Sequence, residues 1–193
     1  MMTPEDILSF WLDEVGPDGW YTRNESVDDA IRSRFRTVWD GAMEGRYGLW
    51  LTHPSGVLAY IILLDQFPRN MFRGEARAFQ SDPIALAAAK QAIHRGWDLK
   101  IDPPGRQFFY LPLEHSENLS DQDRAVRLIK DRLDSDETLL HARVHREVIR
   151  RFGRFPYRNA ALGRTTSEAE ARFLDEEGGY GAVLRSMRAP EAA

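Results

Sequence analysis

Two similar phrases in this 193-residue chain carry most of the side chains that could bind a ligand. The first, DQFPRNMFRG, covers residues 65–74, and the second, GRFPYRNAALGR, covers residues 153–164. Guanidinium groups donate paired hydrogen bonds that suit carboxylates and phosphates, so several of them together predict a site for an anion. The candidate ligand-binding residues are Asp65, Gln66, Arg69, Asn70, Arg73, Arg151, Arg154, Arg158, Asn159 and Arg164.

The same arginines have a second interpretation, which the sequence leaves open. Cations in the last turn of a helix interact favourably with its dipole and can bond its last carbonyls. They could also form internal ion pairs with acids such as Asp65, Glu114 or Glu117. In that case the phrases would stabilise the fold.

Three further residues, His115, Glu117 and His145, have the chemistry of a general base with an orienting carboxylate. They are the candidate catalytic residues if the protein is an enzyme. His141 and His145 are four positions apart and share one face of a helix. A structural interpretation is equally open, in which Ser116 and Glu117 only cap the following helix and the histidines only pack.

A metal site built on His141 and His145 with His115 or Glu117 is the other chemistry that these residue types allow. No acid of the HExxH kind lies between the two helical histidines, which counts against it. The chain has no cysteine, so thiolate sites and disulfides are excluded. We therefore predict neither a metal ligand nor a cofactor.

Composition limits the other possibilities. The apolar fraction of 42% and the length fit one globular domain, and no apolar run is long enough for a membrane span. The N-terminus lacks the features of a secretory signal, which predicts a cytoplasmic protein. A net charge of −4 argues against nucleic-acid binding, although residues 143–164 hold seven arginines and one acid.

The elements that position these residues are predicted to be helices throughout. Pro54 opens a nearly uniformly apolar helix that Pro68 ends, and Gly153 ends a helix that begins near Glu137. Thr165 and Glu168 read as the capping box of the last helix. The pattern predicts an all-α array of seven to nine antiparallel helices, with one domain over residues 1–178 and a flexible tail over 179–193.

A series of motifs in this order resembles the bacterial domain of unknown function 924 family. The motifs are FW at 10–11, LLDQFPRNMFRG at 63–74, LPLEHSE at 111–117 and RFGRFP at 151–156 with His145 six residues before it. The resemblance implies a compact all-α superhelix similar to tetratricopeptide-repeat proteins, in a family without an assigned reaction. Tyr157 stands where the family usually has histidine, which weakens a metal site further.

We therefore expect a pocket lined by arginine, histidine and glutamate that binds a small anionic molecule or an acidic peptide end, with both phrases facing one cleft. One alternative is a hydrolase acting on a phosphate- or carboxylate-bearing substrate. Another is a helical-repeat scaffold for a protein partner. The scaffold would use exposed aromatic anchors, for which the candidates are Trp20, Tyr47, Trp50 and Trp97.

Overall fold

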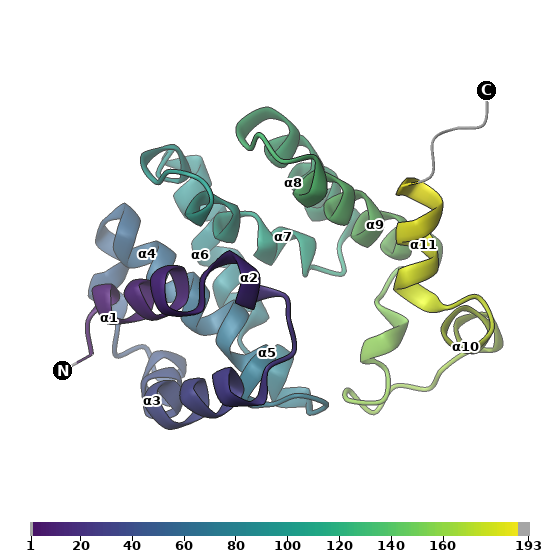
Figure 1. Ribbon diagram of the computed structural model, residues 1–193, viewed down its shortest axis with the longest axis horizontal. Coiled ribbons are helices and arrows are strands. Elements are labelled where there is room, and N and C mark those ends of the chain that lie inside the picture. The colour runs from purple at the N-terminus through teal and green to yellow at the C-terminus, as the bar shows by residue number, and fades with distance from the viewer. Residues whose placement is uncertain (1, 189–193) are drawn as a thin grey trace. The chain divides into compact units, whose positions relative to one another are not determined.

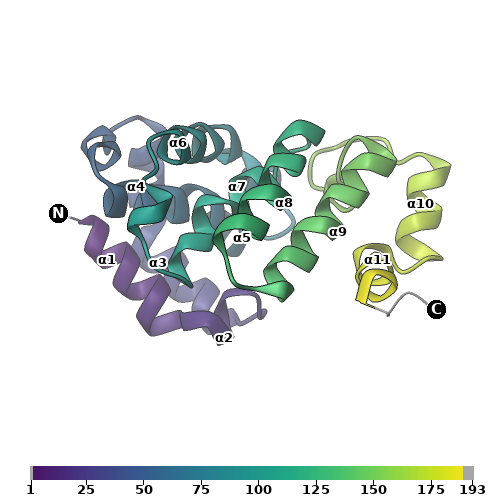
Figure 2. The same cartoon turned by 90° about the horizontal axis from the view of Figure 1, so that it is seen from above.

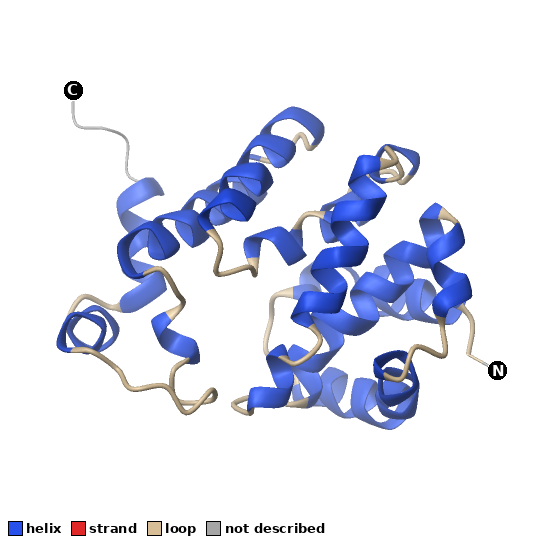
Figure 3. Cartoon of the chain, turned by 180° about the vertical axis from the view of Figure 1, so that it is seen from behind, coloured by secondary structure: helices blue, strands red, loops and turns tan. Residues whose placement is uncertain are grey.

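The computed structural model describes residues 2–188, and all regular secondary structure within them is helical (Figure 3). The prediction of an all-α protein is confirmed. Counted as uninterrupted runs of α- and π-helical residues, this part of the chain holds nine helices, within the predicted range. The tetratricopeptide-like superhelix stays a prediction. No helix in residues 2–188 combines the length and the apolar character needed to cross a membrane.

By its internal contacts the chain divides into two compact units, Met1–Pro112 and Leu113–Ala193, where the sequence predicted one domain over residues 1–178. The predicted flexible tail is wrong for its first part, because residues 179–188 form helix α11 (Gly179–Arg188). Its apolar positions Tyr180, Val183 and Leu184 lie on one face, and that face packs on the core of the second unit. Residues 189–193 lie outside the described part.

The first unit is built from helices that pack in pairs, α1 on α4, α3 on α5 and α4 on α6 (Figure 1). Its α-helices are α1 (Pro4–Leu8), α2 (Gly16–Trp20), α3 (Glu25–Met43), α4 (Pro54–Ile61), α5 (Phe67–Met71) and α6 (Asp82–His94). Helix α7 (Leu111–Glu114) follows at the boundary. Two π-helical segments, Ser9–Val15 and Ile62–Gln66, continue α1 and α4.

Aromatic rings form the centre of the first unit. The rings of Phe10, Phe35 and Phe67 lie 4.9 to 5.9 Å apart between centroids, and Trp11 contacts Phe67 at 5.5 Å. All four side chains are buried. The first Phe-Pro pair is therefore anchored in this core through Phe67.

The helix that begins at Pro54 does not end at Pro68, so that prediction is wrong. The chain stays helical to Met71 because the π-helical segment Ile62–Gln66 lies directly before the proline. Phe67 donates its amide to the carbonyl of Ile62, five residues back. The wider turn accommodates a residue that has no amide hydrogen, as π-bulges do.

The second unit consists of α8 (Leu119–Arg132), α9 (Asp136–Phe152), α10 (Glu168–Asp175) and α11. Helices α8 and α9 lie side by side and are joined by residues 133–135, so they run antiparallel (Figures 1 and 2). Helix α11 also packs on α9. Their shared core contains Val144, Val148, Ile149, Phe155, Phe173 and Val183.

Two helices of the second unit begin with other capping residues than the sequence analysis predicted. The capping box belongs to Ser167 and Glu170, not to Thr165 and Glu168. Asn118, not Ser116 or Glu117, caps α8 by accepting from the amide of Ser120. In both places several polar residues were available, and the helix begins where its apolar face first meets the core.

Candidate functional site

The second Phe-Pro phrase and the histidines 115 and 145 come together within the second unit. The ring centroids of His115 and His145 lie 6.1 Å apart, and the ring of Phe155 lies 5.7 Å from that of His145. The group formed by His115, His145, Phe155 and Arg158 is called the histidine corner below.

The position of His115 is fixed by a buried amide from α8. Gln122 is fully buried and donates through Nε2 to the carbonyl oxygens of Glu114 and Ser116, at 2.5 and 2.7 Å. Ser116 in turn donates its hydroxyl to Asp121 at 2.9 Å. The backbone on either side of His115 is therefore held in place, as expected for the support of a binding residue.

His145 lies on α9 and is a neutral imidazole whose tautomer follows from its contacts. Its Nδ1 is 2.9 Å from the carbonyl oxygen of His141, which can only accept, so Nδ1 carries the hydrogen. Burial and then the neighbouring His115 lower the pKa of His145 to about 3. No group within residues 2–188 hydrogen-bonds Nε2 of His145, and 17% of the side chain is exposed.

Phe155 supports a cation beside the two imidazoles. The guanidinium carbon of Arg158 lies 4.5 Å from the centre of the Phe155 ring, and Arg158 is buried. Tyr157 stacks on the same ring at 5.3 Å and is exposed. The corner therefore combines a neutral acceptor nitrogen with a guanidinium donor.

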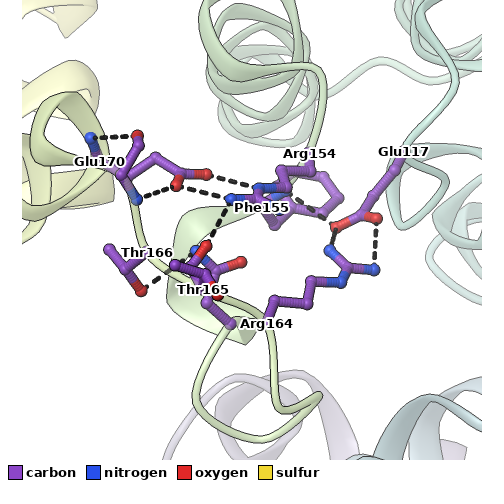
Figure 4. Close-up of polar contacts among 9 residues, drawn as sticks. Glu117, Arg154, Phe155, Arg164, Thr165, Thr166 and Glu170 are labelled. Carbon is purple, nitrogen blue, oxygen red and sulfur yellow. Dashed lines mark hydrogen bonds and ion pairs between the residues drawn. The ribbon is translucent and has the colours of Figure 1, made fainter.

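Glu117 joins the loop after Gly153 to the segment that holds His115 (Figure 4). Its carboxylate accepts from both terminal nitrogens of Arg164, at 2.9 and 2.8 Å, and from the amide of Phe155 at 2.9 Å. Burial works to raise the pKa of Glu117, but the bonds from Arg164 and Phe155 hold it below its ordinary value. Glu117 makes no hydrogen bond to either imidazole, so in this structure it does not orient a catalytic base.

Arg154 is bound at the other side of the loop (Figure 4). It donates to both carboxylate oxygens of Glu170, at 2.6 and 2.7 Å, and to the carbonyl of Thr165 at 2.8 Å. Glu170 also accepts from the amide of Ser167. These bonds, that of Arg154 above all, keep the pKa of Glu170 far below its ordinary value.

The remaining candidates of the second phrase also have protein partners. Arg151 donates to Glu147 at 2.8 Å, and Asn159 donates to the hydroxyl of Thr166 at 3.3 Å. Arg150 and then Arg151 lower the pKa of Glu147 to about 2. These contacts tie the phrase to its own unit.

The first phrase lies in the other unit and starts inside the π-helical segment. Asp65 and Gln66 are buried, and the Gln66 amide donates to the Asp65 carboxylate at 2.6 Å. Arg69 donates to both carboxylate oxygens of Asp82, at 2.9 and 3.0 Å, and also bonds the carbonyl of Asp65. The phrase thus joins the end of α4 to the start of α6.

Asn70 and Arg73 both bind one buried acid on α3. Asp28 accepts from Asn70 at 2.7 Å and from two nitrogens of Arg73 at 2.6 and 2.8 Å. Burial works to raise the pKa of Asp28, but the bonds from Arg73 and Asn70 keep it below its ordinary value. Both phrases therefore direct their arginines to acids of their own unit.

His141 contacts Tyr180 of α11, whose ring also lies 5.1 Å from that of His145. The Nδ1 of His141 lies 2.5 Å from the Tyr180 hydroxyl, and its Nε2 lies 3.2 Å from Glu137. Burial raises the pKa of Tyr180 above its ordinary range. Across residues 2–188 no group of three or more histidine, aspartate or glutamate side chains is arranged to hold a metal ion.

Sequence reasoning missed three residues that position this region, Asp28, Gln122 and Glu170. Asp28 precedes the buried positions Ile31 and Phe35 by three and seven residues, so it continues their stripe. Gln122 continues the stripe of Ala125 and Ile129 in the same way. A polar residue on an apolar stripe was the signal that could have found these two.

Comparison with known proteins agrees with this fold. The sequence profile of a family described as bacterial protein of unknown function, DUF924, matches residues 7–178. A solved structure of the protein of unknown function ATU0120 from Agrobacterium tumefaciens is similar, with 40% identity and a TM-score of 0.85. The match covers 90% of this chain and 97% of that one. No curated protein matches the sequence.

Proposed function

The chain belongs to DUF924, a bacterial family of unknown function, and we propose that it binds a small anionic ligand or the acidic end of a peptide at the histidine corner. The observation that carries the proposal is the state of His145. Its Nδ1–H is committed to a backbone carbonyl, while no described residue hydrogen-bonds its Nε2, and 17% of the side chain is exposed. Such a ring nitrogen can accept from a donor of a ligand while it is neutral, and can donate to an anion once it is protonated.

The charges around His145 are mixed: a carboxylate oxygen of Glu114 lies 3.5 Å from its Nδ1, and Arg158 supplies the positive charge that an anion needs. The positive charge of Arg158 contributes to lowering the pKa of both His145 and Glu117, and its guanidinium group lies over the Phe155 ring. An anion beside Arg158 would favour the protonated form of His145, which would then donate through both nitrogens. Binding an anion and taking up a proton would therefore reinforce each other.

In the proposal, the ion pairs of Glu117 and Glu170 hold the backbone of this site in place. Arg164 and Arg154 hold the loop 153–166 at two points, so the Phe155 ring and the Arg158 guanidinium keep a fixed position. Arg154 and Arg164 would thus act on the ligand through the loop instead of touching it. A site that keeps its geometry before binding loses less entropy on binding.

The two alternative functions have less support. A hydrolytic base works best with a pKa near the working pH, and a pKa of about 3 makes His145 a weak base. For a scaffold, two of the four proposed anchors are not available, because Trp20 and Trp50 are buried. Tyr47 and Trp97 are half-buried.

Native mass spectrometry with added probe anions tests the proposal. The probes are inorganic phosphate and N-acetylglutamate, and the proteins are the wild type, His145→Gln and the control His94→Gln, which changes an exposed histidine of α6. We expect an adduct of at least one probe with the wild type and the control, and its loss from His145→Gln. Equal adducts on all three proteins, or none on the wild type, would contradict the proposal.

A further inference from the structure

A hollow in the first unit, separate from the residues discussed so far, lies between the second half of α3 and the segment 76–80. It is open to the surface and has a volume of about 610 Å³, within the range of small-molecule sites. Six lining residues matter for its chemistry, and they are Arg36, Trp39, Asp40, Met43, Glu44 and Arg77.

The two arginines are held by one buried ring. The guanidinium carbons of Arg36 and Arg77 lie 4.7 and 4.4 Å from the centre of the Phe72 ring. Phe72 is buried and cannot move away without disturbing the core. A ring beneath each guanidinium group fixes its plane and leaves the edges of that plane for hydrogen bonding.

Both arginines keep donors that no residue in the described part of the chain uses. Arg36 donates only through Nε, to Asp40 at 3.2 Å, so its two terminal nitrogens are available. Arg77 donates through Nε to Glu75 at 3.1 Å, and one terminal nitrogen lies 3.0 Å from the same carboxylate oxygen. Its other terminal nitrogen makes no hydrogen bond within residues 2–188. Planar terminal nitrogens of this kind match a carboxylate.

The acidic residues of the hollow determine which kind of carboxylate-bearing ligand fits there. Asp40 pairs with Arg36, while Glu44 pairs with Arg46 and Arg77 with Glu75, so the hollow and its immediate neighbours have no net charge. A phosphate ester with two negative charges would meet two carboxylates there, and like charges close together are unfavourable. A ligand with one negative and one positive group satisfies both kinds of lining residue.

The apolar part of the lining favours a ligand with apolar groups between its two charges. Trp39, which is buried, and Met43, which is half-buried, both line the hollow. Methionine adapts its shape to different apolar groups. We propose that this hollow binds a short zwitterionic peptide with apolar side chains, whose terminal carboxylate binds Arg36 and Arg77 and whose ammonium group faces Asp40 and Glu44.

Calorimetric titration of the full chain with leucyl-leucine tests this proposal. The matched ligands are its C-terminal amide and its N-acetyl derivative, each of which lacks one of the two charges. We expect leucyl-leucine to bind in the micromolar to millimolar range, and each derivative to bind about tenfold more weakly. Arg36→Gln and Arg77→Gln should each weaken leucyl-leucine by about tenfold and leave the affinity for the amide unchanged.

The control variant is Arg32→Gln, which removes an exposed arginine of the same helix that pairs with Asp29. It should bind all three ligands as the wild type does. Equal affinity of leucyl-leucine and its two derivatives would overturn the proposal, since neither charge would then be recognised. So would an absence of binding at millimolar leucyl-leucine, or an equal loss in Arg32→Gln and Arg36→Gln.

Discussion

The two Phe-Pro phrases are alike in sequence and differ in backbone. The first continues a helix through Pro68 with the help of a π-helical segment. The second follows a helix that ends at Gly153 with φ of 69°, and its proline begins a short 3-10 turn, Pro156–Arg158. Yet Phe67 and Phe155 are both fully buried.

What the phrases share is the way each reaches a distant acid. Arg73 and Asn70 bind Asp28, 45 and 42 residues away in sequence, and Arg154 binds Glu170, 16 residues away. The aromatic ring anchors the corner, and the arginine joins it to another helix. The internal ion-pair interpretation accounts for these arginines. Phe155 differs from Phe67 in that the imidazole of His145 and the guanidinium group of Arg158 lie against its ring. The comparison teaches that the repeated letters mark two packing corners, of which the second is the candidate site.

Among the variants that test this comparison, Asp28→Ala should have the largest effect on stability. The Asp28 carboxylate is buried and carries three hydrogen bonds, two of them charged, so we expect a loss of about 3 kcal/mol in the stability of the first unit. Hydrogen exchange of the α3 amides measures this unit directly. Asp29→Ala, which changes the exposed neighbouring acid, should leave the exchange unchanged. Equal protection in both variants would show that the first corner is not held by Asp28.

Replacing Glu170 by alanine is the same experiment in the second unit. We expect a loss of about 2 kcal/mol, because Glu170 bridges Arg154 and the first turn of α10. Exchange of the α10 and α11 amides should increase. Glu168→Ala, an exposed acid in the same first turn, is the control. If both variants had the same small effect, the two corners would not be comparable.

The pH dependence of stability should differ between the two corners, since only the second contains a histidine with a lowered pKa, His145. The pKa of His145 is about 3 in the folded chain and near 6.5 when unfolded, so the unfolded state gains a proton first as the pH falls. Stability is therefore lost from pH 6.5 towards 3, by about 1 to 2 kcal/mol at pH 5 relative to pH 8. His145→Gln should lack this loss between pH 8 and 5. A variant that keeps the full wild-type slope would show that His145 is not the group responsible.

Gly153→Ala should have the smallest effect, and it tests the backbone difference. A φ of 69° is strained for alanine, which should lower the stability of the second unit by about 1 kcal/mol. The first phrase has no glycine in this role. Gly48→Ala is the control, since Gly48 has no positive φ and open space around it. Thermal unfolding compares them, and an equal Tm for the two variants would argue against a strained cap.

The sequence was sufficient for the helical class because proline, glycine and apolar spacing are local signals. It placed the start of α4 at Pro54 and the end of α9 at Gly153. It failed at Pro68, because a π-helical turn is stabilised by the surrounding core and has no residue type of its own.

The site was only partly predictable for a similar reason. The residues Arg154 and Arg164 were identified, but their partners depend on which acids the fold brings near, and Glu170 is close only after α10 has packed. The rings of His115 and His145 lie 6.1 Å apart, whereas Glu117 binds Arg164 and not an imidazole. Tertiary contacts of this kind have no local pattern.

The most direct test of the histidine corner is the nitrogen NMR spectrum of His145, recorded from pH 7 to 4 with and without N-acetylglutamate or phosphate. The account predicts a neutral ring with the hydrogen on Nδ1 throughout this range in the free protein. With a bound anion it predicts a rise in the pKa of His145 and a protonated Nε2. A ring with its hydrogen on Nε2, or a spectrum that neither anion changes, would contradict the proposed site.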